Sequence, residues 1–554
     1  MKRLTTIIAA CLLPPVAALA CTGLIAGRNA TVDGSVMITY SADSHSLYGA
    51  LTSTPAADWA PGSMREIVDW DSGKPLGKIP QPSHTYAVIG NINEHSVAIT
   101  ESTWGGRPEL VDTTGIIDYG TLIQLGLERS RTAREAITVM TELVKEYGYY
   151  SSGESFSIAD KNEVWVLELI GKGPGRKGAV WVAVRIPDDC ISGHANQARI
   201  HQFPLDDPEN CIYSPDVISL AREMGYFNGI NKDFSFSSAY APLDYGALRG
   251  CDARVWSFFR MFNSDMDKYL PYLEGESGSE VMPLYVRPDR KLTLREMKDA
   301  MRDHFDGTPY DMHTDVGGGP FGSPYRFRPM YYEVDGKKYL NERAIATQQT
   351  AFTMVAQLRP NLPDAIGGIL WWGVDDANTT VYVPMYCSST SVPNCFSPSN
   401  GDLYNFTWTS AFWVHNWVAN MAYNRYNPMI GDIREVQKRL EDQFEQEVAT
   451  IDELAVALYG VNEEAAREML TSYSCEAAEY STTTWKELGE FLMVKFLDGN
   501  VKKQNADGSF VRNAYGLPDE VQFPGYSQEY YEEIVRTTGE RLLYKELNNQ
   551  NNEQ

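Results

Sequence analysis

Cys21 is the residue of this chain with the most evident chemical use, because it follows a segment that has the features of a cleavable leader. Residues 1–20 comprise a charged start, an apolar stretch and Ala18-Leu19-Ala20, the small-residue pattern of a cleavage site. We therefore expect a signal peptide over residues 1–20. Cleavage after Ala20 would make Cys21 the first residue of the mature chain.

A cysteine at the start of a chain carries a nucleophilic sulfur and a free α-amine on one residue. An α-amine titrates near pH ~8, so at neutral pH it can take the thiol proton and later return it to a leaving group. Cys21 would then supply both the nucleophile and the base of an acyl-transfer reaction.

Two other interpretations of Cys21 remain open, namely a lipid anchor and a cysteine without a chemical role. Lipid attachment usually requires a leucine three residues before the cysteine, where this chain has Ala18, and Cys11 fits that pattern better. Two short apolar runs, 24–26 and 36–38, flank an Asp-Gly turn signal and predict a β-hairpin. A lipid anchor normally leads into a flexible polar tether, so the strand directly after Cys21 favours the nucleophile.

The same segment carries a family resemblance. Cys21-Thr22, the Asp33-Gly34-Ser35 turn and Asp43-Ser44 resemble the start of the C69 dipeptidases. These are N-terminal nucleophile hydrolases, similar in fold to choloylglycine hydrolases and penicillin V acylases. Further similar segments lie at residues 90–94, 154–160, 194–200 and 368–374. The resemblance extends over roughly residues 21–426.

The resemblance implies an α+β fold in which helices cover two antiparallel sheets in an αββα sandwich. It also implies roles for three further residues. Asp43 would orient the Cys21 amine, and Asn93 and Asn196 would hold the oxyanion, for which neutral side-chain amides are suited. Arg254 is a further site candidate, although Arg249 lies close to it in sequence.

Each of these polar residues also has a structural alternative. Asn93 is predicted in a turn, and Asp43 could cap the end of a strand. The chain departs from the family at Tyr40, where an arginine is common. A cation near the thiol stabilises the thiolate, so Tyr40 or Arg254 would have to take over that role.

The composition excludes several classes of function. The 554-residue chain has a formal charge of −25 and should repel both nucleic acid and anionic membranes. After the leader, no apolar run approaches the ~20 residues that are needed to span a bilayer. An aromatic content of 12% is too rich in packing residues for a disordered chain.

The cysteines and histidines predict neither a metal site nor a cofactor. There is no Cys-x-x-Cys pair and no histidine cluster, and we expect His194 to be structural. An exported chain permits disulfides. Cys387 and Cys395, on either side of a turn-rich loop, form the most plausible pair.

Periodicity predicts hairpins that bracket helices, which is typical of antiparallel sheets covered by helices. A capping box at Thr132-Ala-Arg-Glu135 lies in a stretch, 112–147, that should be helical until Gly148. Strands are expected at 84–90, 96–102, 155–159, 164–170 and 179–186, helices at 214–224, 294–304 and 411–426, and a loop at 317–324. The expected domains are a catalytic domain over 21–431 and a helical C-terminal extension over 432–554.

Together these observations predict an exported cysteine dipeptidase, periplasmic or extracellular, that acts on small peptides and could form homo-oligomers through its extension. An amidase that acts on bile-salt conjugates or penicillins is a close alternative with the same nucleophile. A lipid-anchored binding protein is the alternative from another class.

Overall fold

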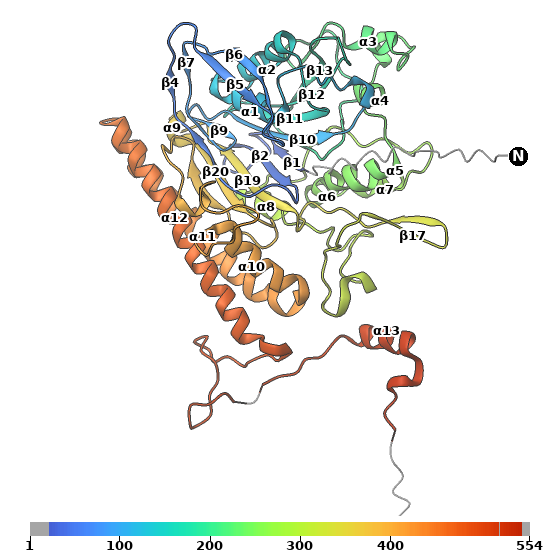
Figure 1. Cartoon of the computed structure of the whole chain (residues 1–554), viewed down its shortest axis with the longest axis vertical. Helices are drawn as coiled ribbons and strands as arrows, with labels where there is room; N and C mark the ends of the chain where they lie inside the picture. The colour runs from blue at the N-terminus through green and yellow to red at the C-terminus, as the bar shows by residue number, and fades with distance from the viewer. Residues whose placement is uncertain (1–20, 520, 546–554) are drawn as a thin grey trace, which may run out of the picture.

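A computed structural model describes residues 21–519 and 521–545 (Figure 1). The expected signal peptide at residues 1–20 and the last residues of the chain lie outside these described residues. Helices and antiparallel sheets together make the fold α+β, as expected. No helix of the described part is both long enough and apolar enough to cross a membrane.

The first sheet has seven strands and contains the predicted hairpin after Cys21. Its strand order is β16-β14-β1-β2-β19-β20-β21. Ile25 lies opposite Ile38 in the antiparallel pair β1–β2. The strands are β1 (Gly23–Ala26), β2 (Val36–Asp43), β14 (Ile191–His194), β16 (Tyr285–Val286), β19 (Thr350–Leu358), β20 (Gly368–Val374) and β21 (Val383–Tyr386).

The second sheet has eight strands in the order β15-β13-β12-β11-β10-β9-β8-β3. The strands are β3 (Ser53–Thr54), β8 (Val88–Ile89), β9 (Ile92–Asn93), β10 (Ala98–Trp104), β11 (Gly153–Ala159), β12 (Val164–Gly171), β13 (Ala179–Ile186) and β15 (Cys211–Tyr213). The three strands predicted over 155–186 are therefore confirmed. The hairpin expected between 84–90 and 96–102 instead contains the short strand β9, which pairs with both β8 and β10.

Three two-stranded sheets lie outside these two large sheets. They pair β4 (Ala57–Asp58) with β7 (His84–Thr85), β5 (Met64–Val68) with β6 (Pro75–Pro80), and β17 (Tyr331–Val334) with β18 (Lys337–Leu340).

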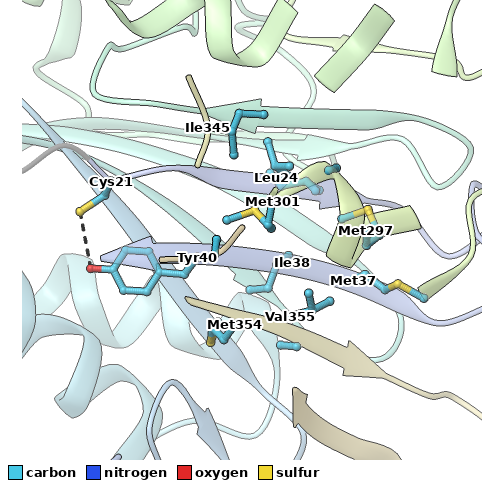
Figure 2. Packing of buried hydrophobic residues seen from close by; sticks show 14 of the residues in the cluster. Cys21, Leu24, Met37, Ile38, Tyr40, Met297, Met301, Ile345, Met354 and Val355 are labelled. Carbon is cyan, nitrogen blue, oxygen red and sulfur yellow. Dashed lines mark hydrogen bonds between the residues drawn. The ribbon is translucent and has the colours of Figure 1, made fainter. Parts of the chain in front are cut away.

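The two large sheets pack against each other through β2 on one side and β10 and β11 on the other. Every residue of β2 is buried, because one face of the strand meets the second sheet and the other face meets the core around Met301 and Ile345 (Figure 2). His194 of β14 links the sheets with both ring nitrogens, at 2.7 Å from Ser102 Oγ and 2.8 Å from Ser157 Oγ. Cys21, two residues before β1, is thereby held between two layers.

Helices α1 (Tyr119–Glu128) and α2 (Ala133–Tyr147) cover the second sheet. The stretch predicted as helical over 112–147 divides between them, because Thr132 caps a new helix. Its hydroxyl accepts a hydrogen bond from Glu135 N at 3.2 Å. The predicted end at Gly148 is confirmed, and this glycine has a φ of +79° that L side chains rarely adopt.

Helices α10 (Ala411–Asn424), α11 (Tyr426–Tyr459) and α12 (Glu463–Lys495) pack against the first sheet near β20 and β21 (Figure 1). The boundary expected between residues 431 and 432 falls inside α11. Glu441 of α11 is fully buried and accepts hydrogen bonds from Tyr382 N, at 2.9 Å, and from Arg302 and Arg295. These helices therefore belong to the same core as the sheets.

Among the remaining helices, α6 (Ala253–Phe262) packs on β14. The predicted helices at 214–224 and 294–304 exist as α3 (Val217–Glu223) and α8 (Leu294–Ala300), and the loop at 317–324 contains a 3₁₀ segment, Val316–Phe321. The others are α4 (Phe236–Tyr240), α5 (Tyr245–Ala247), α7 (Leu270–Leu273), α9 (Asp364–Gly367) and α13 (Gln528–Thr538).

The expected Cys387–Cys395 disulfide is wrong, since all seven cysteines of the described residues are free. Cys387 follows β21, and its thiol donates to Asp364 O at 3.1 Å. Cys395 lies in a 3₁₀ turn, and its own backbone N–H donates to the Glu479 carboxylate of α12 at 3.0 Å. The two cysteines are held by different elements despite their short separation in sequence.

Candidate active site

Cys21 lies in the wall of a cavity of about 510 Å³ and is itself only 2% exposed. The wall is built by the end of β2, the loop after it, the tip of the β5–β6 hairpin, the turn between β8 and β9, and the start of α1. The residues of this wall that bear on the chemistry are Cys21, Tyr40, Asp43, Asp71, Asn91, Glu101 and Tyr119. A volume of this size suits a small-molecule ligand.

Tyr40 is the nearest polar partner of the Cys21 sulfur. The thiol donates to Tyr40 Oη across 3.8 Å, as the dashed line in Figure 2 marks. Tyr40 Oη in turn donates to Glu101 of β10, a contact between the two sheets. The residue that stands in place of the family arginine therefore connects the sulfur to a buried carboxyl group.

The surroundings keep the thiol protonated. Burial, followed by the nearby Glu101 and Asp43, raises the pKa of Cys21 well above its usual value. The backbone N–H of Asp43 and the hydroxyl of Tyr40 act in the opposite direction and lower that pKa. The raising effects on the pKa outweigh the lowering ones, so the thiol is neutral and requires a base in order to react.

Glu101 and Glu154 form a buried carboxyl pair that sequence reasoning missed. Glu154 of β11 lies opposite Thr103, whose hydroxyl donates to it at 2.9 Å, and Glu101 lies on the same face of the sheet. Burial raises the pKa of both glutamates, and the Glu101 charge raises that of Glu154 further. Of the two glutamates, Glu154 therefore has the more strongly raised pKa. The signal in the sequence was a glutamate inside an otherwise apolar or hydroxyl-bearing strand.

Asp43 is fully buried beside Cys21 at the end of β2. Its carboxylate forms an ion pair with Arg343 and accepts a hydrogen bond from Thr350 Oγ1 at 2.6 Å. Arg343 lies in the loop before β19, and Thr350 is the first residue of that strand. Sequence reasoning missed Arg343, which lies 300 positions after Asp43. The ion pair fixes Asp43 in place and balances its charge.

Arg254 of α6 connects Cys21 to Asn196. One guanidinium nitrogen donates to Cys21 O at 2.8 Å and to Thr22 Oγ1 at 2.7 Å. The other donates to Ala195 O at 3.0 Å and to Asn196 Oδ1 at 2.8 Å. The structure thus brings together three of the predicted residues, with Arg254 bound to the carbonyl oxygen of Cys21. Burial, with Arg343 as the next contribution, lowers the pKa of Arg254 to about 10.

Asn196 has a left-handed backbone with a φ of +60°. Its side-chain amide donates to Thr103 O at 2.6 Å. It lines a second cavity of about 710 Å³, which adjoins the first because Asp71 and Tyr119 border both. Asn196 is therefore linked to Cys21 through Arg254 and to the first cavity through a shared wall.

Asn93 does not line either cavity. Its amide nitrogen donates to Leu127 O and Ser130 O, each at 2.8 Å. Its amide oxygen accepts from the backbone of His95 and Val97, each at 3.0 Å. Asn91, two residues earlier, lines the cavity and donates to Ile99 O at 2.9 Å. The sequence identified the segment 90–94, but the conformation of the turn between β8 and β9 decides that Asn91, and not Asn93, lines the cavity.

A family profile described as Peptidase family C69 matches residues 48–439. The chain belongs to peptidase family C69. This confirms the family expected from the sequence and makes the protein a peptide hydrolase. The match includes Asn91, Asn196 and Arg254 and begins after Cys21 and Asp43.

Several similar proteins carry dipeptidase names. A probable dipeptidase of Latilactobacillus sakei is 24% identical over 459 residues, which cover 78% of this C69 chain and 87% of that protein. A probable dipeptidase of Salmonella dublin is 25% identical over 395 residues, which cover 66% of this chain and 81% of that protein. Dipeptidase A of Lactobacillus helveticus is 25% identical over 447 residues, which cover 77% of this chain and 85% of that protein.

Proposed function

We propose that this C69 peptidase is an exported dipeptidase whose nucleophile is Cys21, acting as the first residue of the processed chain. The observation that carries the proposal is the position of Cys21. Its sulfur lines the cavity while Arg254 holds its carbonyl oxygen. Removal of residues 1–20 would place a free amine on that same held residue. The names of the relatives and the two sheets packed face to face support an N-terminal nucleophile hydrolase.

The first step is proton removal from the thiol. Because its surroundings raise the pKa of Cys21, the thiol does not ionise by itself near neutral pH. The α-amine of the processed chain takes this proton, directly or through one water. Asp43, fixed by Arg343, accepts a hydrogen bond from the amine and orients it.

The sulfur then attacks the carbonyl carbon of the peptide bond. The side-chain amides of Asn91 and Asn196 lie on the walls of the two adjoining cavities and serve as donors to the oxyanion. The protonated amine of Cys21 gives its proton to the departing amino acid, and a thioester remains on the sulfur. Water, deprotonated by the same amine, attacks the thioester, releases the N-terminal amino acid and restores the thiol.

The test compares Cys21→Ala with the wild-type protein and with Cys475→Ala, which removes a cysteine on α12. The α12 variant should hydrolyse dipeptides at the wild-type rate, whereas Cys21→Ala should be inactive with an unchanged melting temperature. Intact mass and N-terminal sequencing of the exported wild-type protein should show an unmodified Cys21 as the first residue. Full activity of Cys21→Ala would overturn the proposal.

Two further outcomes would point to other functions. Turnover of penicillin V or glycine-conjugated bile salts, without turnover of dipeptides, would make the protein an amidase that uses the same nucleophile. An acylated cysteine, partition into detergent and absence of turnover would indicate a lipid-anchored binding protein.

A further inference from the structure

Asp71 lies at the tip of the β5–β6 hairpin, on the border between the two cavities. The tip is docked on the first turn of α1. The backbone N–H of Trp70 donates to Asp118 at 2.9 Å, and the hydroxyl of Tyr119 donates to Asp71 Oδ1 at 2.8 Å. Gly120 lets the hairpin approach, since a Cβ there would lie 2.6 Å from Trp70 Cγ. Asp71 therefore has a defined position although it belongs to a hairpin tip.

The other carboxylates of the cavity wall are already engaged. Asp43 is paired with Arg343, and Glu101 is 1% exposed and accepts from Tyr40. Asp402 accepts from its own loop, at 2.7 Å from Tyr404 N and at 2.7 Å from the side chain of Asn405. Asp71 is solvent-exposed and has no ion-pair partner among the residues that the structure describes.

We propose that Asp71 binds the α-ammonium group of the substrate's N-terminal residue and so places the scissile carbonyl at Cys21. This inference rests on the proposed dipeptidase function and assigns a residue to substrate recognition. In a dipeptide the ammonium nitrogen is two bonds from the scissile carbonyl carbon, so its binding group must lie close to the nucleophile. Asp71 and Tyr119, which holds it, line the same cavity as Cys21.

The local charge favours a cation at this place. Although Asp71 reaches solvent, partial desolvation by the surrounding cavity wall raises its pKa, and the charges of Asp69, Glu101 and Asp118 raise that pKa further against the effect of the Tyr119 hydroxyl. A bound ammonium group would relieve the repulsion between Asp71 and these neighbouring carboxylates. Within the described part of the chain, the wall of the Cys21 cavity includes no lysine, arginine or histidine. A hydrogen bond between ammonium and carboxylate is also among the stronger ones in proteins.

The experiment measures kcat and KM of Asp71→Asn and Asp402→Asn for Ala-Ala, Leu-Ala and Lys-Ala. The two substitutions remove the same charge from the same wall, but only Asp71 is free to bind a cation. Loss of a charged hydrogen bond should raise KM about tenfold to a hundredfold for all three substrates in Asp71→Asn, with a smaller change in kcat. Asp402→Asn should behave as wild type. With wild-type protein, KM should rise above pH ~8 as the α-ammonium of the substrate loses its proton.

Other outcomes would overturn the inference. An effect restricted to Lys-Ala would assign Asp71 to a basic side chain of the substrate, and equal effects of both substitutions would indicate only the general negative field of the cavity. A second readout is independent of turnover. Calorimetry on Cys21→Ala should show that Ala-Ala binds at least tenfold more tightly than N-acetyl-Ala-Ala, and that Asp71→Asn removes this difference.

This binding measurement also separates the two proposals. Failure of the wild-type protein to hydrolyse any dipeptide would contradict the proposed function. Hydrolysis with an unchanged KM in Asp71→Asn, or equal binding of the free and acetylated dipeptides, would contradict the role of Asp71 alone.

Discussion

The neighbours of the Cys21 sulfur are a hydroxyl group and carboxyl groups. A positively charged neighbour would stabilise the thiolate, whereas the carboxyl groups do not. Tyr40 bridges the thiol to Glu101, while Arg254 binds the carbonyl oxygen of Cys21. The two nearest carboxylates, Glu101 and Asp43, both raise the pKa of the thiol. In the proposed mechanism this environment makes reactivity depend on an amine that is exposed only after the leader is removed.

The first prediction concerns Glu101→Gln. Because the Glu101 charge raises the pKa of Cys21, its removal should lower that pKa. A neighbouring charge typically changes a pKa by ~1 unit or more, so the thiolate fraction at neutral pH should increase about tenfold. The rate of alkylation of Cys21 by iodoacetamide, followed by peptide mass spectrometry, measures this. Alkylation of Cys475 in the same samples should be unchanged, and slower labelling of Cys21 would contradict the electrostatic argument.

The second prediction concerns Arg254→Lys. One ammonium group cannot reproduce the five hydrogen bonds that the planar guanidinium group of Arg254 makes, so the buried carbonyl oxygens of Cys21 and Ala195 lose donors. Each unsatisfied group costs about 1–3 kcal/mol. We expect a lower melting temperature and a kcat reduced at least tenfold, with a smaller change in KM. Arg249→Lys, which affects an ion pair with Glu342 instead, is the matched control and should retain kcat.

At the scale of elements, the site depends on how the two sheets are held together. Cys21 directly precedes Thr22 and β1, and Tyr40 lies in β2 of the same sheet, whereas β10 and β11 carry Glu101 and Glu154 in the other sheet. His194 crosses between the sheets with two hydrogen bonds to serine hydroxyls, which confirms its expected structural role. Burial, followed by the charges of Arg199 and Arg254, lowers the pKa of His194 to about 3.

This shift predicts a loss of stability in acid. Unfolded His194 takes up a proton near pH 6.5, whereas the folded protein resists protonation down to about pH 3. The contribution to the free energy of unfolding is therefore present above pH ~6.5 and is lost as the pH falls toward 3. We expect the His194→Gln variant to melt at a lower temperature than wild type at pH 7. Its melting temperature should fall less than that of wild type when the pH is lowered. Melting temperatures from pH 7.5 to 4 measure this, with the exposed His84→Gln as control; parallel curves for wild type and His194→Gln would contradict it.

At the scale of the whole molecule, the C-terminal region has two parts with different relations to the core. α11 and α12 bury side chains such as Glu441 and Trp485 against the first sheet. The residues after 500 that the structure describes, 501–519 and 521–545, include no buried side chain. They form α13 and isolated bridges below the body of the molecule (Figure 1).

The two parts should respond differently to truncation. A chain that ends at Asn500 should keep its melting temperature within a few degrees and retain wild-type kcat/KM, because no buried side chain is removed. A chain that ends at Gly460 lacks α12 and exposes the apolar surface under Trp485, so it should be insoluble or inactive. Loss of activity in the chain ending at Asn500 would assign a functional role to the terminal segment, such as the expected subunit contact.

The features that depend on neighbours along the chain could be predicted from the amino-acid sequence. The β1–β2 hairpin follows from two apolar runs around an Asp-Gly turn, and the start and end of α2 follow from Thr132 and Gly148. Strands β11 to β13 follow from their apolar patterns and the turns between them. Capping, turn formation and side-chain alternation are local effects, so a single sequence contains them. The family resemblance was also present in short segments of sequence.

The side chains that meet at Cys21 could not be predicted in this way, because they come together through contacts between segments distant in sequence. Arg254 lies 233 positions from Cys21, and Glu101 reaches Tyr40 across the interface between two sheets. The choice between Asn91 and Asn93 depends on the orientation of one turn, and the separation of Cys387 from Cys395 depends on the packing of α12. Periodicity shows which face of an element is buried, but the partner on that face is chosen by the packing of elements distant in sequence. That packing placed Asp71 at the border of both cavities and the carboxyl pair behind Tyr40.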